Sequence, residues 1–306
     1  MSYILGIDTS NYTTSMALCS RDGKIVSNQK MLLPVKAGER GLRQSDAVFS
    51  HTVNLPKVAE MLGKADICAV GYSAYPRDNE GSYMPCFLCG KAYAQSLSSL
   101  LDIPCVSFSH QRGHIRAALY SAEAEHLLGG EYLAFHLSGG TTEVLHVKNG
   151  DITLIGGTND LTAGQAIDRV GVMMGLQFPC GAELEKLSEN ASACKSKISV
   201  KGYECNMSGL ENLAAKMYKN GASREDVAAF TIDFVLRTLD KMTENLTCDY
   251  PGLPLVYSGG VMSNKRIKKY FKEKYGAYFA EPAFSSDNAA GTALLAYDKL
   301  KDELFR

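Results

Sequence analysis

The fold is decided by two apolar stretches, Tyr3-Ile-Leu-Gly-Ile-Asp8 and Tyr132-Leu-Ala-Phe-His-Leu137. Each has the character of a β-strand, ends in a hydroxyl-rich turn, and is followed by a second strand, a tight turn and a third strand. The tight turns contain Asp22-Gly23 and Asn149-Gly150, dipeptides that favour hairpins because both positions tolerate positive φ. The recurrence predicts a duplicated α/β unit, in which each half has a mixed sheet flanked by helices.

After the hairpins the pattern changes to alternating helices and strands. The expected elements are a helix at 44–62, a strand at 67–72, a helix from 87, a strand at 104–108, a helix carrying the next histidines and, in the second half, a strand at 255–257. A chain of 306 residues favours two domains. We expect the first at 1–130, with a helix at 288–306 packing back on it, and the second at 131–287, with ligands in the cleft between them.

Composition fits an ordinary globular protein and gives no global attraction for nucleic acid. Hydrophobic residues make up 45% and charged residues 21% of the chain, and the formal net charge is -1. A contact with tRNA or DNA therefore needs a local basic patch. The best candidate is the run from Lys265 to Lys269 with Lys272 and Lys274, although such runs usually form a solvated helix face.

The first residues, the apolar runs and the cysteines of the sequence favour a cytoplasmic protein without a membrane segment. The first residues lack a basic region and include Asp8, so they predict a strand rather than a signal peptide, and no apolar run is long enough to span a bilayer. Nine cysteines, scattered through apolar segments, suit a reducing compartment. The close pair Cys86 and Cys89 has either a redox or metal role or simply packs at the start of a helix.

The strongest chemical signal is the pair His110 and His114 in Ser109-His-Gln-Arg-Gly-His114. Imidazoles at i and i+4 share one helical face, which is the spacing with which zinc helices offer two nitrogen ligands. Gln111 stands where a zinc protease carries its glutamate base, and an amide cannot accept a proton at neutral pH. The pair fits either a non-protease metal site that needs a third ligand or two partly buried histidines bonded to backbone carbonyls.

Two glycine turns follow strands and are candidates for binding phosphate. Ser138-Gly-Gly-Thr-Thr142 lies between two strands, where glycines allow close backbone approach and N–H groups can surround an anion. Ser258-Gly-Gly-Val261 closes another strand and enters a helix at about Ser263, which adds the positive end of a helix dipole. Their symmetric placement favours a nucleotide site. The alternative is that the glycines serve only the turns.

Three carboxylates have both a binding and a structural interpretation. Asp168 lies on a helix and Glu185 follows the turn at Pro179; each suits contacts to ribose hydroxyls or a solvated surface position. Asp287 opens the last helix, where an N-cap role is the default and a metal-ligand role is the sharper alternative.

Taken together, these segments resemble the glycoprotease-type family of ASKHA proteins, whose best understood members are tRNA adenosine threonylcarbamoyltransferases. The similarity runs in order through most of the chain, in the segments Leu5–Ser10, His110–His114, Leu137–Thr141, Ala163–Asp168, Phe178–Gly181, Met207–Leu210, Ser258–Asn264 and Ser286–Asn288. The resemblance implies duplicated actin-like, RNase H-like domains with a nucleotide and metal cleft between them.

The family's site residues are carried over position by position. In that family two histidines and a late aspartate hold one metal ion, which by resemblance assigns the metal and catalytic roles to His110, His114 and Asp287. The expected metal is Fe or Zn, with Mg as a further candidate, acting as a Lewis acid. The positions that would contact threonylcarbamoyl-AMP, or a related carbamoyl-adenylate from an ATP-type nucleotide, are Ser138, Gly139, Gly140, Thr141, Thr142, Asp168, Gly181, Glu185, Gly259, Gly260 and Asn264.

Departures from the family pattern concentrate on the carbamoyl and acceptor sides. Family members usually carry His in place of Thr141, Glu in place of Arg112 and a Gly-Pro-Gly-Leu loop in place of Tyr75–Pro85, and their acidic N-terminal turn is here Asn11-Tyr-Thr-Thr14. The resemblance therefore implies a divergent paralogue. The candidate acceptor-side residues are Asp8, Ser10, Asn11, Arg77 and Ser82.

The implied reaction is attack by the amino group of a tRNA adenosine on the activated carbamoyl, with AMP leaving. One alternative keeps the carbamoyl-adenylate but transfers the group to a small molecule. Another is a non-catalytic ASKHA protein that binds nucleotide, although such a scaffold has no chemical need for a metal triad. The expected partners are the adenylate, tRNA, and a second copy or a paralogous ASKHA protein in a dimer.

Overall fold

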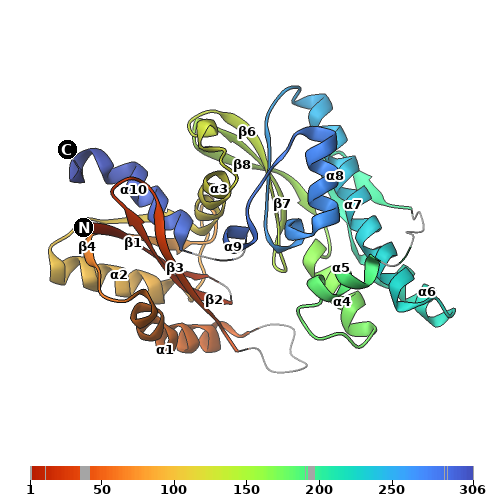
Figure 1. Ribbon diagram of the computed structural model, residues 1–306, viewed down its shortest axis with the longest axis horizontal. Helices are drawn as coiled ribbons and strands as arrows, with labels where there is room; N and C mark the ends of the chain where they lie inside the picture. Colours follow the sequence, from red (N-terminus) through yellow and green to blue (C-terminus); the bar gives the residue numbers. More distant parts are fainter. Residues whose placement is uncertain are drawn as a thin grey trace. The chain divides into compact units, whose positions relative to one another are not determined.

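The computed structural model describes residues 2–10, 12–34, 42–189, 191, 197–285, 287 and 289–305. The chain divides into two compact units, one formed by residues 1–120 with 286–306 and the other by residues 121–285 (Figure 1). The boundaries expected from the sequence, at 130 and 287, lie further along the chain, so Asp287 belongs to the first unit. Within the described residues, no helix combines the length and apolarity needed to cross a bilayer.

The first unit is built around a five-stranded sheet in the order β3-β2-β1-β4-β5. Strands β1 to β3 form an antiparallel meander, whereas β4 and β5 continue the sheet in parallel with β1. The expected Asp22-Gly23 turn joins β2 to β3, with Gly23 at φ 73°. The elements are β1 (Ser2–Ser10), β2 (Thr13–Ser20), β3 (Ile25–Leu32), α1 (Gln44–Leu62), β4 (Asp66–Tyr75), α2 (Phe87–Leu101), β5 (Cys105–Ser109), α3 (His110–Ser121) and α10 (Ala290–Leu304).

Alternation along β1 decides which helices cover each face of this sheet. Leu5 and Ile7 join an apolar cluster with residues of α1 and α2. Gly6 faces the other way, where an added Cβ would lie 2.4 Å from the carbonyl oxygen of Ala289, so the start of α10 packs directly on the backbone of β1. Because side chains of a strand alternate with period two, Asp8 points to the same side as Gly6.

The second unit repeats the strand order of the first. Its seven-stranded sheet runs β12-β11-β6-β7-β8-β10-β9; β8-β7-β6 is again antiparallel, and β11 and β12 follow in parallel. The turn Asn149-Gly150 has φ values of 53° and 85°. The elements are η1 (Glu125–Leu127), β6 (Glu131–Leu137), β7 (Thr142–Lys148), β8 (Asp151–Thr158), α4 (Ala163–Met173), α5 (Gly181–Ser188), β9 (Ser199–Lys201), β10 (Glu204–Asn206), α6 (Ser208–Lys219), α7 (Arg224–Asp249), β11 (Leu255–Ser258), η2 (Gly260–Ser263), α8 (Lys265–Tyr275), β12 (Tyr278–Phe279) and α9 (Pro282–Ser285).

Helices α4 to α8 share one apolar core with the second sheet. Leu133, Phe135 and Leu137 of β6 point into this core and are at most 1% exposed. Each such buried side chain contributes about 1.5–3 kcal/mol relative to an exposed position. The duplicated α/β fold predicted from the sequence is confirmed, and the glycine loops that end β6 and β11 leave the same edge of the second sheet.

One buried side chain makes the stability of the first unit depend on pH. His51 of α1 is fully buried; its Nδ1 lies 2.8 Å from Oγ1 of Thr14 on β2, and its Nε2 has no hydrogen-bond partner among the described residues. Burial lowers the pKa of His51 to about 4, and the carboxylates of Asp8 and Asp287 offset this only in part. The imidazole is therefore neutral in the folded protein at neutral pH.

We expect acid to destabilise the protein through this residue. The unfolded chain protonates His51 near pH 6.5, whereas the folded chain protonates it near pH 4. The free energy of unfolding is therefore unaffected by this residue above pH 6.5, and it falls by up to about 3 kcal/mol as the pH drops from 6.5 to 4. His51→Gln does not titrate. Its free energy of unfolding in urea should therefore rise relative to that of the wild type by this amount as the pH falls from about 7 to about 4. A difference that stays constant over this range would contradict the assignment.

Candidate functional site

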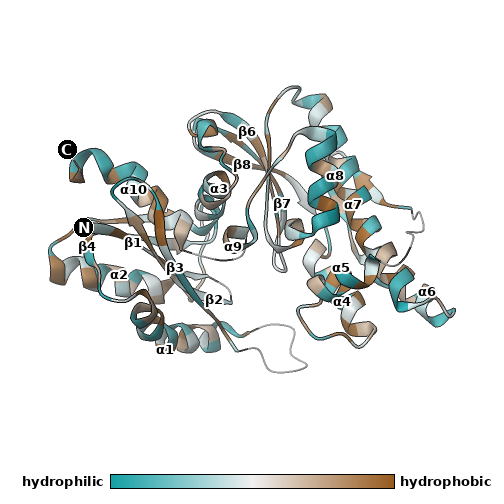
Figure 2. Ribbon diagram, viewed as in Figure 1, coloured by the Kyte–Doolittle hydropathy of each residue, from teal (hydrophilic) through white to brown (hydrophobic). Residues whose placement is uncertain are grey.

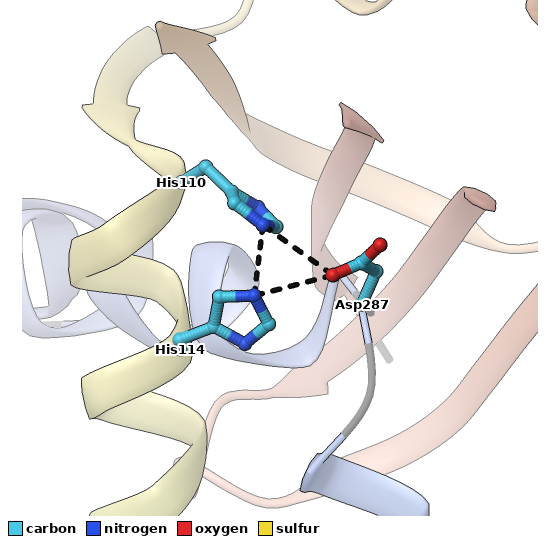
Figure 3. A group of neighbouring side chains, drawn as sticks. All are labelled: His110, His114 and Asp287. Atoms are coloured by element: carbon cyan, nitrogen blue, oxygen red, sulfur yellow. Dashed lines mark hydrogen bonds and ion pairs between the residues drawn. The ribbon is translucent and has the colours of Figure 1, made fainter. Parts of the chain in front are cut away.

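The candidate metal site is built on helix α3, which begins at His110 directly after β5 ends at Ser109. His114 follows one turn later, and Figure 3 shows both rings and the carboxylate of Asp287 turned toward one another. The two Nε2 atoms are 2.8 Å apart, and Oδ1 of Asp287 lies 3.5 Å from Nε2 of His110 and 3.3 Å from Nε2 of His114. Among the described residues, this is the one group of His, Cys, Asp and Glu side chains arranged as metal ligands.

The distances between these three atoms fit a shared cation. Ligand atoms about 2.1 Å from a metal lie roughly 3.0–3.4 Å from one another in octahedral or tetrahedral sites. The contacts of the Asp287 oxygen are close to this range, and the two nitrogens need to separate only slightly. Three basic atoms that converge in this way repel one another unless a proton or a cation lies between them.

Asp287 reaches the site from the far end of the chain. The default N-cap interpretation of this residue is wrong, because α10 begins at Ala290 and its N-cap is Ala289. The carboxylate of Asp287 instead contacts the two histidines. The third ligand that the histidine pair required is therefore brought to it by the segment that precedes α10.

Asp8 orients His110 from behind. Its Oδ2 accepts hydrogen bonds from Nδ1 of His110 at 2.7 Å and from Oγ of Ser73 at 2.6 Å, and its Oδ1 accepts one from the backbone N of Ser10 at 2.8 Å. Such a carboxylate fixes the tautomer, so that the Nε2 lone pair remains for a ligand. Asp8 and Ser10 are 1% and 0% exposed, which does not match the acceptor-side role expected from the sequence. Asn11 lies outside the described residues.

The charges in this site are strongly coupled. Burial lowers the pKa of His110, but the carboxylates of Asp8 and Asp287 reverse this effect and raise it to about 10. Burial and the neighbouring His110 lower the pKa of His114. Burial raises the pKa of Asp287, but the two histidines more than reverse this and hold it well below its usual range. Without a metal, His110 therefore carries a proton on each ring nitrogen, with Nδ1 directed at Asp8, and a cation would take the place of the proton on Nε2.

Asp8→Asn is expected to weaken metal binding about 10- to 100-fold, because the neutral amide no longer fixes the His110 tautomer or raises the basicity of Nε2. Competition with a fluorescent chelator measures this change. Asp66→Asn is a matched control, since Asp66 starts β4 at an exposed position and bonds Ser2. Equal affinity of Asp8→Asn and the wild type would show that Asp8 does not support the ligand.

A contact between two glycines sets the spacing of α10 and α3. Gly113 lies between the two histidines on α3, and a Cβ added to Gly291, in the first turn of α10, would lie only 1.8 Å from the carbonyl oxygen of Gly113. Gly71 of β4 meets α10 in the same way, with an added Cβ 2.8 Å from the carbonyl oxygen of Thr292. These close backbone contacts hold the start of α10, and hence Asp287, within reach of the histidines.

The remaining acceptor-side residues lie on the segment between β4 and α2. The backbone N of Arg77 donates to Oγ of Ser82 at 2.9 Å, which closes the segment into a turn. Asp78 forms an ion pair with Arg112 of α3. Sequence reasoning noted Arg112 and this segment as separate departures from the family pattern, but it missed Asp78, whose partner is distant in the sequence.

In the second unit the two glycine loops lie side by side. Gly259 has a φ of 94°, and an added Cβ would lie 2.1 Å from the carbonyl oxygen of Leu137, so the loop after β11 crosses the end of β6. Ser258 reinforces the contact, because its Oγ donates to the carbonyl oxygen of Phe135 at 3.2 Å and lies 3.0 Å from Nδ1 of His136. Gly260, which follows the buried Gly259, is exposed.

In the glycine loop after β6, the hydroxyl of Ser138 accepts hydrogen bonds from two backbone N–H groups that could otherwise bind a phosphate. Oγ of Ser138 accepts hydrogen bonds from the N atoms of Gly140 and Thr141 at 3.2 and 3.1 Å. Oγ1 of Thr142 accepts from the N of Ala163 at 2.8 Å, which ties the loop to the start of α4. The backbone at Gly139 and Gly140 is exposed, but a phosphate bound there has to compete with the Ser138 hydroxyl.

Glu185 and Asn264 meet at the start of helix α8. Oε1 of Glu185 accepts a hydrogen bond from the N of Lys265 at 2.6 Å, and Oδ1 of Asn264 accepts one from the N of Ile267 at 3.0 Å. The helix begins at Lys265 rather than at about Ser263 as expected, because a short 3-10 turn follows Gly259. The positive end of α8 is therefore occupied by protein groups and not directed freely toward a phosphate.

Asp168 supports the turn before helix α5. Its Oδ1 accepts a hydrogen bond from the N of Cys180 at 2.8 Å, directly before Gly181, the first residue of α5. Burial raises the pKa of Asp168, and the Cys180 N–H offsets part of this shift. Asp168 is thus a half-buried carboxyl with a structural partner on Oδ1, and its Oδ2 accepts no hydrogen bond from the residues that the structure describes.

The basic run on α8 is largely neutralised by acids. Figure 2 shows a strongly hydrophilic helix, and the ion pairs are Arg266 with Asp233, Lys268 with Glu281, Lys269 with Glu273, and Lys274 with Asp240 and Glu244. The basic run therefore forms a solvated, ion-paired helix face, which was the alternative to a nucleic-acid contact in the sequence analysis. The geometry does not favour α8 as a nucleic-acid contact.

Cys86 and Cys89 are free thiols at the start of α2. Cys86 is fully buried, and Sγ of Cys89 donates to the carbonyl oxygen of Val48 at 3.5 Å. Neither belongs to a metal-ligand group among the described residues. Their geometry fits packing at a helix start.

Comparison with known proteins identifies similar sequences. A family model described as "tRNA N6-adenosine threonylcarbamoyltransferase" matches residues 45–294. A protein of this name from Thermosipho africanus is 30% identical over 324 residues, covering 97% of this chain and 94% of the relative. Another from Methanopyrus kandleri is 27% identical over 297 residues, covering 94% and 84%.

Solved structures of ASKHA-type, actin-like proteins share the fold. The activator of 2-hydroxyisocaproyl-CoA dehydratase from Clostridium difficile has a TM-score of 0.59 at 16% identity and covers 98% of this chain and 96% of its own. Full-length HypF has a TM-score of 0.61 at 15% identity, with 100% of this chain and 47% of that chain covered. A ROK family glucokinase from Streptomyces griseus has a TM-score of 0.51 at 13% identity, covering 96% and 98%.

Proposed function

Because the chain belongs to the family of tRNA N6-adenosine threonylcarbamoyltransferases, we propose that it transfers a threonylcarbamoyl group from its adenylate to the amino group of a tRNA adenosine, in a metal-dependent reaction. The convergence of His110, His114 and Asp287, with Asp8 behind His110, carries this proposal. A nucleotide-binding scaffold without catalysis has no use for three converging basic ligands, which are unfavourable to bury without a cation.

The donor set fits a transition metal. Two imidazole nitrogens and one carboxylate oxygen suit Fe²⁺ or Zn²⁺ better than Mg²⁺, which prefers oxygen ligands. His110, His114 and Asp287 would hold the ion, and Asp8 would keep Nε2 of His110 available. When bound, the metal supplies Lewis acidity that polarises phosphate or carbamoyl oxygens of the donor.

We assign the adenylate to the glycine loops of the second unit. The exposed backbone at Gly139, Gly140 and Gly260 suits the phosphate. The family resemblance assigns the nucleoside to Asp168, Gly181, Glu185 and Asn264. The adenosine amine forms the new C–N bond to the carbamoyl carbon. AMP leaves with the electron pair of the broken C–O bond, and the amine loses its proton.

The test is to incubate the metal-loaded protein with threonylcarbamoyl-AMP and tRNA that lacks the modification, and to digest the tRNA for mass spectrometry. The expected product is N6-threonylcarbamoyladenosine. A parallel reaction also contains an extract from a strain in which the gene for this protein is deleted. This extract supplies any partner proteins that the reaction requires. Unmodified tRNA in both reactions would refute the proposal, and carbamoylation of a small molecule instead would establish the alternative acceptor class.

A further inference from the structure

The segment of residues 76–86, between β4 and α2, is fastened to the candidate metal helix. The carbonyl oxygen of Pro76 accepts a hydrogen bond from the N of Gln111 at 3.0 Å. Asp78 then forms its ion pair with Nε of Arg112. Gln111 and Arg112 follow His110 on α3, so the first half of the segment is held by the same helical turn that carries the metal ligands.

The other end of the segment is anchored beside the same histidine. The carbonyl oxygen of Cys86 accepts a hydrogen bond from Oγ1 of Thr9 at 2.9 Å. Phe87, the next residue, is buried, and its ring centroid lies 6.0 Å from that of His110 in an edge-on arrangement. Because both ends are fixed next to His110, the residues between them keep a defined position near the candidate metal ligands.

Tyr83 lies between these anchors and is 63% exposed. Its side chain makes no hydrogen bond, ion pair or ring contact within the part of the chain that the structure describes. A tyrosine ring offers a large, rigid surface with little conformational entropy to lose. Unpaired nucleobases bind proteins by stacking on such rings, whereas bases inside a duplex are already stacked.

Strand topology brings a second exposed aromatic residue to the same edge of the first sheet. Strands β1, β4 and β5 are parallel neighbours, so their carboxyl ends lie together, where ligands of open α/β sheets bind. Tyr12, 39% exposed, follows β1; the segment with Tyr83 follows β4; and His110 follows β5. Two exposed rings and the candidate metal ligands therefore share one edge.

We propose that Tyr83, positioned by the Asp78–Arg112 ion pair, stacks on an unpaired base of the RNA acceptor and so holds the acceptor next to the metal site. This inference rests on the proposed function, since a transferase acting on tRNA adenosine has to hold a base outside a duplex. Tyr83 is the binding residue. Asp78 and Arg112 are positioning residues, which act through the segment that they fasten.

Binding is tested by fluorescence anisotropy with metal-loaded protein and a labelled RNA hairpin that has an adenosine in its unpaired loop. Tyr83→Leu should raise the Kd about 5- to 100-fold, the range of a lost base–aromatic stack. Tyr83→Phe keeps the ring and should stay within about twofold of the wild type. Equal affinity of Tyr83→Leu and the wild type would overturn the inference, as would tighter binding of a duplex RNA of the same composition.

Positioning is tested by exchanging charges. Asp78→Arg and Arg112→Asp should each raise the KM for the RNA acceptor about tenfold, with kcat and metal content unchanged, and the double exchange should restore KM. Failure of the double exchange, or loss of metal in Asp78→Arg, would overturn the positioning role. A wild-type protein that binds the hairpin but transfers nothing contradicts the proposed function alone, whereas transfer with an unchanged KM in Tyr83→Leu contradicts this inference alone.

Discussion

Replacing His110 and His114 together by alanine is expected to abolish metal binding and transfer at once. The two substitutions remove two of the three ligand atoms, which lie within 3.5 Å of one another, and they leave the Asp8 and Asp287 carboxylates without a neutralising group. A metal that acts as a Lewis acid contributes several kcal/mol, so turnover should fall by at least about a thousandfold. Elemental analysis of the purified protein and mass spectrometry of tRNA nucleosides measure the two losses.

His126→Ala is the matched control for the double substitution. His126 belongs to the second unit and contacts Tyr278 through its ring, so its removal should leave metal content and turnover unchanged. A wild-type protein without stoichiometric metal would contradict the assignment of His110, His114 and Asp287 as metal ligands. Rescue of a deletion strain by His114→Ala would instead favour a non-catalytic partner role.

Gly291→Ala is expected to lower the free energy of unfolding by about 3 kcal/mol and to weaken metal binding at the same time. The new Cβ would lie 1.8 Å from the carbonyl oxygen and 2.6 Å from the carbonyl carbon of Gly113. These are backbone atoms, which cannot rotate away, so α10 has to move off α3 and take Asp287 with it. Urea unfolding in the presence of a chelator measures the loss without the contribution of bound metal.

Gly209→Ala gives the matched control. Gly209 is an exposed residue in the first turn of α6, and an added Cβ would meet nothing within 4 Å. Replacing glycine by alanine in such a helix should stabilise the protein, by up to about 1 kcal/mol. If Gly291→Ala instead kept wild-type stability and metal content, the glycine contact would not set the site.

The fold could be predicted from the sequence because its signals are local. The apolar, strand-like runs of β1 and β6 and the two hairpin dipeptides can each be recognised from neighbouring residues. Their recurrence in both halves of the chain indicated the duplication. Strands β9, β10 and β12 are only two or three residues long. Such strands are too short to show an alternation of polar and apolar side chains, so they could not be predicted from the sequence. The start of α8 was misplaced because a 3-10 turn intervenes between the glycine loop and the helix.

The candidate site was only partly predictable, because its contacts join distant segments. Spacing along α3 identified the two histidines, but the pattern alone left two roles open for Asp287, a helix cap by default or a metal ligand, and only the resemblance assigned it to the two histidines. Asp8 was expected at the acceptor side; that it faces α10 follows from the packing of Gly6, on the same side of β1, against Ala289, which is distant in the sequence. The pairing of Glu185 with the backbone of Lys265 leaves no trace in local spacing.

The position of Asp287 also has a consequence for biosynthesis. Residues 286–306 belong to the first unit, yet the ribosome adds them after the whole second unit, residues 121–285. Until they emerge, the sheet face at Gly6 and Gly71 lacks its covering helix and is open to chaperones and proteases. A chain that stops before Asp287 lacks the third ligand as well, so stable metal loading would require that translation has passed Asp287.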